Sequence, residues 1–433
     1  MNDAGASDAI RRSIAAIWQM ESGRILGRLT RVLRDVGLAE EMAQEAFVSA
    51  LEQWPRTGLP DNPGAWLMTT ARNRALDHLR RLRLHDRKSG LLAADPEGAG
   101  AQDAALEQAL AADVPDDLLR LIFIACHPVL PTDARLALTL RLLGGLTAAE
   151  IGRAFLAGEA AIQQRIVRAK RTLAEARVPF ELPKEAERAA RLASVLEVIY
   201  LMFNEGYVAT AGEHWLRPAL CEEAQRLGRV LAQLVPEEPE VHGLVALMEI
   251  QASRNRARVG PGGEPILLLD QDRARWDPLM ISRGLAALGL AERVAGGAGS
   301  ALGPYALQAA IAACHARAPA AADTDWARIV ALYDALSQVS PSPVVALNRA
   351  VALAMAYGPA AGLASVDALA ADARLQDYHL LPSVRGDLLE KLGRFEEASA
   401  EFARAAQLTL NLKEQELLRA RERRCGRCAQ DLH

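Results

Sequence analysis

The sequence has few cysteines, few aromatic residues and no long hydrophobic run. Its five cysteines are an odd number and scattered, which argues against a disulfide framework and fits a reducing compartment. No uninterrupted apolar stretch approaches the roughly 18 residues of a membrane span, so we expect no transmembrane helix and no membrane contact. The first ten residues lack a basic start followed by an apolar core, so we expect no secretory leader and a cytoplasmic location.

Long runs that alternate apolar and polar residues are also missing, and aromatic side chains make up only 4% of the chain. Ala and Leu dominate instead, and this composition predicts an all-α fold. The length of 433 residues allows about two to four domains with buried cores. The net charge is +1 over residues 1–180 and −5 over residues 181–433, so neither part is a polyelectrolyte. Any contact with nucleic acid must therefore come from a local basic face.

Residues 146–171 contain two short amphipathic runs. Thr147, followed by Glu150, has the capping-box pattern of a helix start. We expect Gly158 to take a positive φ in a tight turn, and a second helix to begin at Glu159. Two helices joined in this way are typical of a DNA-binding helix-turn-helix, whereas an ordinary helical hairpin with a solvated charged face is the alternative.

The second helix of this pair is basic on one side. Gln and Arg side chains can make paired hydrogen bonds to one base edge, which favours the DNA-binding interpretation. The helical period buries Ile162, Ile166 and Ala169 and leaves outside Gln163, Gln164, Arg165, Arg168, Lys170 and Arg171.

Residues 8–53 predict two helices, with Gly37 ending the first of them. The apolar residues of the second helix share one face, and its acidic residues lie on the other. A solvated surface is the ordinary explanation of such a face. The polar residues that the pattern exposes are Glu40, Glu41, Gln44, Glu45 and Glu52.

A Pro- and Gly-rich loop follows, flanked by Trp54 and Trp66. The next predicted helix runs from Ala65 to about Arg87, and residues 71–88 carry seven Lys or Arg against two Asp. A loop with flanking aromatic rings beside a basic helix suits unpaired nucleic acid, because rings hold bases while arginines hold phosphates. Two tryptophans that are simply buried in the core are the alternative.

Residues 89–112 are rich in Gly, Ala and acidic residues, which predicts an interdomain linker that folds partly into helix. Two apolar helices then lead into the helix-turn-helix. They contain Cys126 and His127, a pair that could suggest nucleophile chemistry. We favour a buried thiol beside a helix-ending His-Pro.

The order of these features resembles the extracytoplasmic-function (ECF) class of bacterial RNA polymerase sigma factors. AEEMAQEAF (39–47) is similar to their polymerase-binding segment, and AWLMTTARNRALDHLRR (65–81) to the segment that melts the promoter and reads its −10 element. Residues 145–173 are similar to the segment that reads the −35 element. The sequence departs from this class at Ala161, where Ser or Thr is usual, and at Glu40-Glu41, where an Asp pair is usual.

The resemblance implies region 2 over 8–88, a linker over 89–112 and region 4 over 113–178. It implies no active site, cofactor or metal, because polymerase performs the chemistry. The implied partners are promoter DNA and core RNA polymerase, through its clamp helices and flap, and the 54–64 loop would capture a flipped base. The implied contacts are Glu40, Glu41, Gln44 and Glu45 for polymerase, Arg72, Asn73, Arg74, His78, Arg80 and Arg81 for the −10 region, and Glu159, Ala161, Gln164, Arg165 and Arg168 for the −35 groove.

Some 250 further residues predict a C-terminal helical extension over 184–424. Residues 380–410 match the spacing of small and large residues in a tetratricopeptide repeat, and 344–371 match it more loosely. Such repeats predict a short helical solenoid. The expected helices are 217–235, 239–257, 278–294, 304–317, 325–339, 343–357, 360–371, 380–392 and 395–409, after a long helix from 185.

Three stretches of the extension stand apart. Residues 259–277 predict a turn, a short extended segment and the polar cluster DQDRARWD, which we interpret as a salt-bridged loop that caps the next helix rather than a cation or acid–base site. NEGY (204–207) and this cluster are the surfaces of interest. We interpret Cys425-Gly-Arg-Cys428 as a frayed basic tail, because structural zinc needs four ligands.

These segments resemble one sigma subgroup with a long extension, which implies a regulatory module that contacts a protein partner or the sigma regions themselves. The alternative is a stand-alone helix-turn-helix regulator with a sensing domain of helical repeats. An acidic helix and a base-capturing loop are not needed by such a regulator, so residues 1–88 favour the sigma factor.

Overall fold

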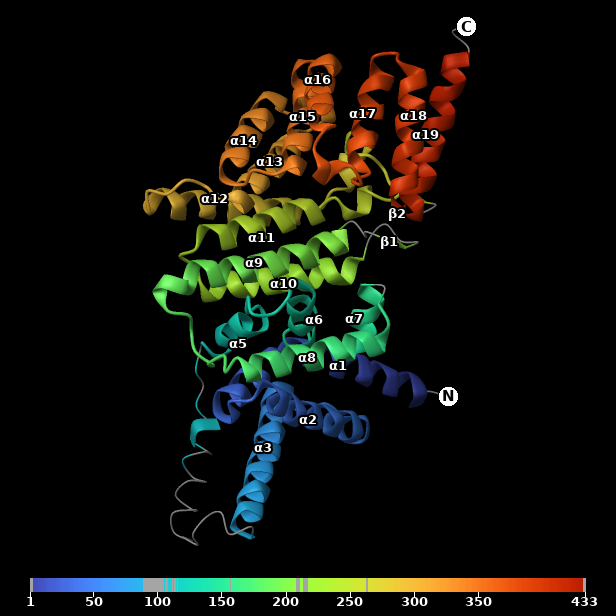
Figure 1. Cartoon of the computed structure of the whole chain (residues 1–433). Helices are drawn as coiled ribbons and strands as arrows, with labels where there is room; N and C mark the ends of the chain where they lie inside the picture. Colours follow the sequence, from blue (N-terminus) through green and yellow to red (C-terminus); the bar gives the residue numbers. More distant parts are fainter. Residues whose placement is uncertain are drawn as a thin grey trace. The chain divides into compact units, whose positions relative to one another are not determined.

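The computed structural model describes residues 3–88, 105, 108–110, 112, 114, 116–155, 157–207, 211–212, 217–261 and 264–430. Nearly all of these residues are helical, which confirms the all-α prediction (Figure 1). The chain divides into two compact units, Met1–Val198 and Ile199–His433. The predicted linker, residues 89–112, falls almost entirely outside the described residues.

The first unit begins with α1 (Asp3–Leu33), α2 (Val36–Thr57) and α3 (Pro63–Lys88), which pack on one another. The prediction that Gly37 ends the first helix is wrong. The break lies at Arg34 and Asp35, where the Asp35 carboxylate accepts a hydrogen bond from Leu38 N at 2.9 Å and caps α2. A side-chain cap decided this boundary, and Gly37 lies inside the first turn of α2.

The second half of this unit contains α5 (Asp117–Ala125), α6 (Thr132–Leu142), α7 (Ala148–Ala154) and α8 (Glu159–Glu175). Helix α5 packs on α1, and α6 and α7 pack on α8. The first part of α9 (Glu185–Tyr207) also belongs to this unit. Arg135 on α6 is buried and donates hydrogen bonds to Ser194 Oγ at 2.6 Å and to Glu197 Oε2 at 2.9 Å. The first part of α9 is therefore part of the packing of this unit.

The second unit contains the rest of α9 and a series of helices in which each contacts the next in sequence (Figure 1). Their bounds match the predicted helical runs to within a few residues. The series comprises α10 (Pro218–Leu234), α11 (Pro239–Ala252), α12 (Pro278–Gly297), α13 (Pro304–Arg317), α14 (Trp326–Val339), α15 (Pro343–Tyr357), α16 (Pro359–Leu369), α17 (Leu380–Lys391), α18 (Phe395–Leu408) and α19 (Leu412–Gln430).

Close helix approach in the predicted repeat 380–410 depends on a small residue. A Cβ atom at Gly386 on α17 would lie 3.0 Å from the ring of Phe402 on α18. Phe402 is fully buried, and Arg421 on α19 stacks on its ring at 4.3 Å. The small and large positions that the pattern identified thus meet across one helix pair.

The C-terminal tail is helical rather than frayed, so that prediction is wrong. Helix α19 packs on α18, and Cys425 is buried between them. Arg421 and Arg424 pair with Glu390 at 2.6 Å each. Charged residues that looked solvated in the sequence therefore pair across helices. Residues Ala211–Gly212 (β1) and Leu410–Asn411 (β2) also form a short parallel bridge that the sequence did not indicate.

Candidate nucleic-acid interface

The helix-turn-helix predicted from residues 146–171 is present. The Thr147 hydroxyl accepts from Glu150 N, and Glu150 accepts from Thr147 N at 2.7 Å, so the capping box is confirmed. The expected positive φ at Gly158 is wrong, because Gly158 is the N-cap of α8 with φ −65°. The close approach occurs instead at Gly152, where a Cβ atom would lie 2.6 Å from Ala157 O. The turn therefore depends on the missing side chain of Gly152 in the first helix, and not on a positive φ at Gly158.

Helix α8 presents a polar face. Ile162, Ile166 and Ala169 are buried as predicted, and Glu159, Ala161, Gln164 and Arg168 are exposed. Arg165 is half-buried and lies 3.6 Å from Asp133 at the start of α6. A hollow of about 610 Å³ separates the start of α6 from this face, and Gln164, Arg165 and Arg168 line it. The five residues predicted for the −35 groove thus lie on one continuous stretch of α8.

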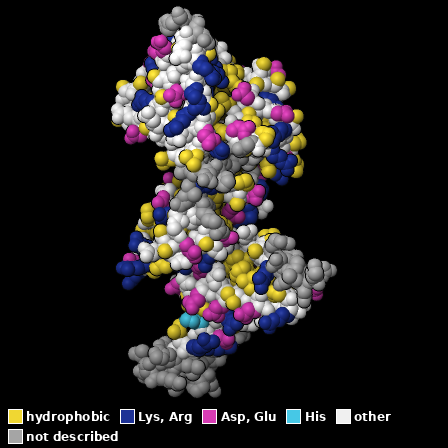
Figure 2. Space-filling view, turned by 90° about the vertical axis from the view of Figure 1, so that its right-hand side faces the viewer, with side chains coloured by type: hydrophobic (Ala, Val, Ile, Leu, Met, Phe, Trp, Pro, Cys, Tyr) yellow, Lys and Arg dark blue, Asp and Glu magenta, His cyan; other side chains and the backbone are white. Residues whose placement is uncertain are grey.

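The residues predicted for the −10 region follow the surface of α3. Asn73, Arg74, Arg80 and Arg81 are exposed, and Arg72 and His78 are half-buried. Arg74 Nε lies 3.6 Å from Glu45 Oε2 on α2, so a predicted DNA contact pairs with a predicted polymerase contact. On the face that Figure 2 shows, Lys and Arg alternate with Asp and Glu, as expected of a chain without a strong net charge.

The predicted loop from Trp54 to Trp66 is shorter in the structure. Helix α2 continues through Pro55 to Thr57 and α3 begins at Pro63, which leaves Gly58 to Asn62 as the connection. Trp54 is 1% exposed, and its ring packs edge-on against that of Trp66 with centroids 5.2 Å apart. Trp54 is therefore a core residue, and the exposed Leu59 lies at the tip that remains.

Glu40 differs from the other predicted polymerase contacts. Glu41 and Glu45 are exposed and Gln44 is half-buried, but the Glu40 side chain is only 8% exposed. Arg141 Nε on α6 donates to its carboxylate at 2.5 Å, and the Lys170 ammonium on α8 pairs with the same group. The prediction that Lys170 points outward is wrong. Each of these two cations comes from the helix-turn-helix half of the unit.

Further contacts join α1 to that half. Arg31 Nε pairs with Asp117 at 2.8 Å, and the Asp117 side chain is 6% exposed. A Cβ atom at Gly27 would lie 2.8 Å from Asp117 O, so α1 and α5 touch at backbone distance. A Cβ atom at Gly145 would lie 3.1 Å from the indole of Trp18. We call this contact surface between α1–α2 and α5–α8 the seam. No local pattern in the sequence indicated it, since it joins residues about 80 to 130 positions apart.

The two motifs of the extension meet in the second unit. Arg258 stacks on the Tyr207 ring at 3.5 Å, and Arg254 lies 5.9 Å from that ring and 5.7 Å from the ring of Trp276. Arg273 donates to His315 O and Ala318 O at 2.5 Å. Arginine contacts therefore link the NEGY segment and the DQDRARWD cluster to neighbouring parts of the second unit.

The interpretation of DQDRARWD as a helix cap is confirmed at one residue. Asp277 accepts from Leu279 N and Met280 N and begins α12.

Four of the five cysteines are buried. Cys126 is 1% exposed and contacts Thr139 Oγ1 at 3.4 Å, and burial raises the pKa of its thiol to about 11. The interpretation of Cys126 as a buried thiol is thereby confirmed. Within the described ranges, no three His, Cys, Asp or Glu are placed to hold one metal ion, and no helix is long and apolar enough to cross a membrane.

Three segments of the chain match known family models. Residues 17–84 match the Sigma-70 region 2 family, residues 120–173 match Sigma-70 region 4, and residues 191–292 match a family of unknown function (DUF6596). No solved structure matches the chain.

Relatives match along both parts of the sequence. An uncharacterized protein of Rhizobium meliloti is 46% identical over 399 residues, which cover 91% of each chain. The ECF RNA polymerase sigma factor SigK of Mycobacterium tuberculosis is 30% identical over 168 residues, 37% of this chain and 83% of that one. The SigK protein of Mycobacterium ulcerans is 30% identical over 167 residues, 38% of this chain and 84% of that one.

Proposed function

Because the chain belongs to the ECF family of RNA polymerase sigma factors, we propose that it directs core polymerase to promoters by reading the −35 element with α8 and the −10 element with α3. The observation that carries this proposal is the exposed row on α8. Gln164 and Arg168 lie one helical turn apart, beside Arg165, on a helix whose other face is buried. A helix held in this way can enter the major groove with its polar side foremost.

The side-chain contacts that this row makes within the protein, one inside α8 and one to α6, are weak and replaceable. Arg168 reaches Gln164 only at 3.5 Å, and Arg165 and Asp133 are 3.6 Å apart at a partly exposed position. Exposed pairs of this kind stabilise a protein by about 0–1 kcal/mol. Base edges and phosphates offer stronger, paired acceptors, so these side chains can turn to DNA at little cost.

Run-off transcription with purified core polymerase tests the proposal. The template is the DNA upstream of the chain's own operon. We expect the intact chain to start transcription and the pair Arg165→Ala/Arg168→Ala to abolish it. Arg171→Ala is the matched control, because Arg171 is exposed on the same helix but pairs with Glu175 at 2.7 Å outside this row. A chain that neither binds core polymerase nor starts transcription would instead be a stand-alone regulator.

Reading both elements requires the seam to open. Elements named −35 and −10 lie about 25 base pairs apart, or roughly 85 Å along B-DNA. In the structure α3 packs on α2, and α2 is bonded to α8 through Glu40 and Lys170. The 24 residues of the predicted linker can span about 80 Å when extended. We propose that the chain opens along the seam when polymerase binds, which frees Glu40 to act with Glu41, Gln44 and Glu45 as the polymerase surface.

We propose that the extension regulates this step, through a protein partner or through the sigma regions. Its charge supports the proposal, since residues 181–433 carry −5 after two basic helices in the same chain. The predicted domain limits of 8–88, 113–178 and 184–424 describe the functional parts. The contacts of Arg135 with α9 show that residues 185–198 must stay with the first unit in any truncation.

A further inference from the structure

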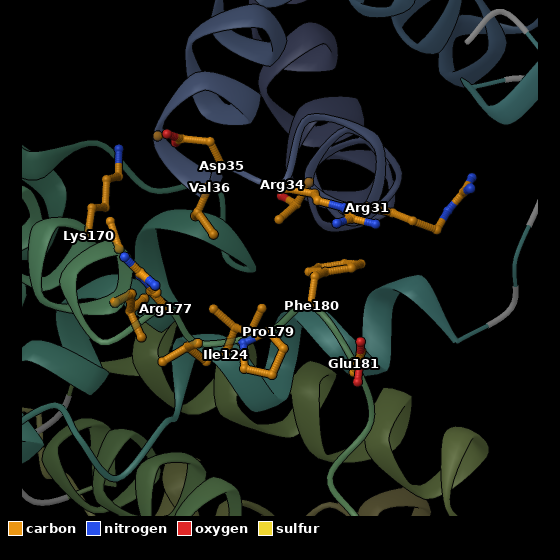
Figure 3. A pocket seen from close by; sticks show the side chains of 15 residues that line it. Arg31, Arg34, Asp35, Val36, Ile124, Lys170, Arg177, Pro179, Phe180 and Glu181 are labelled. Carbon is orange, nitrogen blue, oxygen red and sulfur yellow. The ribbon is translucent and has the colours of Figure 1, made fainter. Parts of the chain in front are cut away.

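A hollow of about 500 Å³ lies at the seam, and residues from both of its sides line it. This volume is within the range of roughly 300–1,000 Å³ that small-molecule sites occupy. The sigma-factor function proposed above makes no use of it. Figure 3 shows Arg31, Arg34 and Val36 on one side and Ile124, Pro179 and Phe180 on the other.

One wall of the hollow is apolar. Ile124 and Leu173 are buried beneath it, and Val36, Val178 and Phe180 are half-buried at its surface. Phe180 stacks on no other ring among the described residues. An apolar body placed here would therefore remove side-chain surface from water on several sides at once.

The mouth of the hollow is basic. The lining includes Arg31, Lys170, Arg34 and Arg177, but Arg31 is bonded to Asp117 and Lys170 to Glu40. Within the part of the chain that the structure describes, the guanidinium groups of Arg34 and Arg177 have no ion pair or hydrogen bond. Two unpaired cations thus face one hollow.

The backbone places these two arginines. Arg34 has φ 54° and Arg177 has φ 49°, the two positive values among the described residues other than glycine. Each follows the C-terminal end of a helix, α1 or α8, so the two chain reversals meet at the hollow. Asp35 is engaged as the cap of α2, which leaves Glu181 as the one lining carboxylate without a described partner.

We propose that this hollow binds a small organic anion with an apolar body, with its charged group between Arg34 and Arg177. A carboxylate or sulfonate can accept from both guanidinium groups, while an acyl or aryl body covers the apolar wall. Because the lining comes from both sides of the seam, such a ligand binds the closed chain and shifts the population toward it. This last consequence rests on the proposed sigma-factor function, whereas the binding itself does not.

Fluorescence titration of the full chain with 8-anilinonaphthalene-1-sulfonate tests the site. Its uncharged parent, N-phenyl-1-naphthylamine, is the matched probe. We expect one saturable site for the sulfonate, and the pair Arg34→Ala/Arg177→Ala to weaken it by roughly tenfold or more while leaving the uncharged probe unchanged. Arg56→Ala/Arg256→Ala is the control, because both residues are exposed arginines outside the hollow.

Ala174→Trp provides a second test that does not change charge. Ala174 is exposed and lines the hollow, so the larger ring fills it without entering a packed core. We expect this variant to bind neither probe, with an unchanged circular-dichroism melt. Sulfonate binding that survives both Ala174→Trp and the loss of the two arginines would overturn the proposal.

Displacement of the sulfonate probe identifies the apolar body. Decanoate supplies an acyl carboxylate and 1-naphthoate an aryl carboxylate, and decanol is the uncharged match for decanoate. We expect one or both carboxylates to displace the probe at a concentration roughly tenfold or more lower than decanol requires. Displacement by decanol as effectively as by decanoate would show that the arginines recognise no charge, against the proposal.

A polymerase-binding assay separates this inference from the proposed function. We expect the ligand that displaces the probe to weaken binding of core polymerase to the wild-type chain but not to Arg34→Ala/Arg177→Ala. If the chain binds no polymerase under any condition, the sigma-factor function fails, while the probe titrations still decide the site. If polymerase binds equally with and without ligand, the coupling to the closed state is wrong.

Discussion

Glu40→Gln removes the negative charge that pairs with two cations across the seam. The Glu40 side chain is 8% exposed and pairs with both Arg141 and Lys170, whose side chains are 20% and 23% exposed. In the variant two partly buried cations face each other with no carboxylate between them. Breaking one partner of a buried ion pair costs about 3–5 kcal/mol, and the residual exposure of the two cations argues for the lower value.

A loss of about 3 kcal/mol lowers the ratio of closed to open chain roughly a hundredfold, since each 1.4 kcal/mol is a factor of ten. Energy transfer between dyes measures this ratio. Exposed Asp61 and Gln163 are suitable labelling positions as cysteines, in a Cys428→Ser background that removes the half-buried native thiol. We expect Glu40→Gln to shift the chain toward low transfer.

Glu41→Gln is the matched control, because Glu41 is exposed and neighbours Glu40 on the same helix. It should change the closed population by less than about 0.5 kcal/mol. The same transfer in both variants would refute the argument that Glu40 holds the seam. The affinity for core polymerase is a second readout. If only the open chain binds polymerase, the apparent affinity is the intrinsic affinity multiplied by the fraction of chain that is open. Glu40→Gln, which raises this fraction, should therefore bind polymerase more tightly than Glu41→Gln.

Three further predictions concern stability and reactivity. Burial, with Arg254 and Arg273 nearby, lowers the pKa of His315 to about 4. Below pH 6.5, the ordinary pKa of histidine, the unfolded chain binds a proton at His315 that the folded chain does not bind, so the free energy of unfolding should fall by about 2 kcal/mol from pH 7 to pH 5. Thermal melts of His315→Phe should lack this part of the pH dependence. Iodoacetamide should label Cys428 first, as mass spectrometry of the native chain can show, because the other four thiols are buried; early labelling of any buried thiol would contradict this. A chain ending at Val198 should still fold and unfold cooperatively in a circular-dichroism melt, because it retains the partners of Arg135. Equal transcription from this chain and the full chain under all conditions would exclude a regulatory extension.

Much of the fold could be predicted from local pattern. The capping box at Thr147, the buried Ile162 and Ile166 of α8, and the bounds of α10 to α18 follow from capping chemistry and the helical period, both of which act within a few residues. The three sigma-like segments were readable for a similar reason, since each lies on one helix or helix pair.

Errors arose where a side-chain cap or tertiary packing overrode the local pattern. Gly37 looked like a helix end, but the Asp35 carboxylate caps the helix that contains it. The C-terminal ERRCGRC looked frayed, but its Arg424 pairs with Glu390 and its Cys425 packs in a core cluster. A side-chain cap decided the first case, and packing against neighbouring helices decided the second.

The sequence by itself determined that the chain is helical, that it carries sigma regions 2 and 4, and which apolar side chains of α8 are buried. Only the tertiary structure decided that Glu40 is buried, that Lys170 turns inward, and that Arg34 and Arg177 meet at one hollow. The physical reason is that helix formation depends on neighbours in sequence, whereas the seam brings together residues some 80 or more positions apart. Their proximity is set by how whole helices pack, which no short-range pattern encodes.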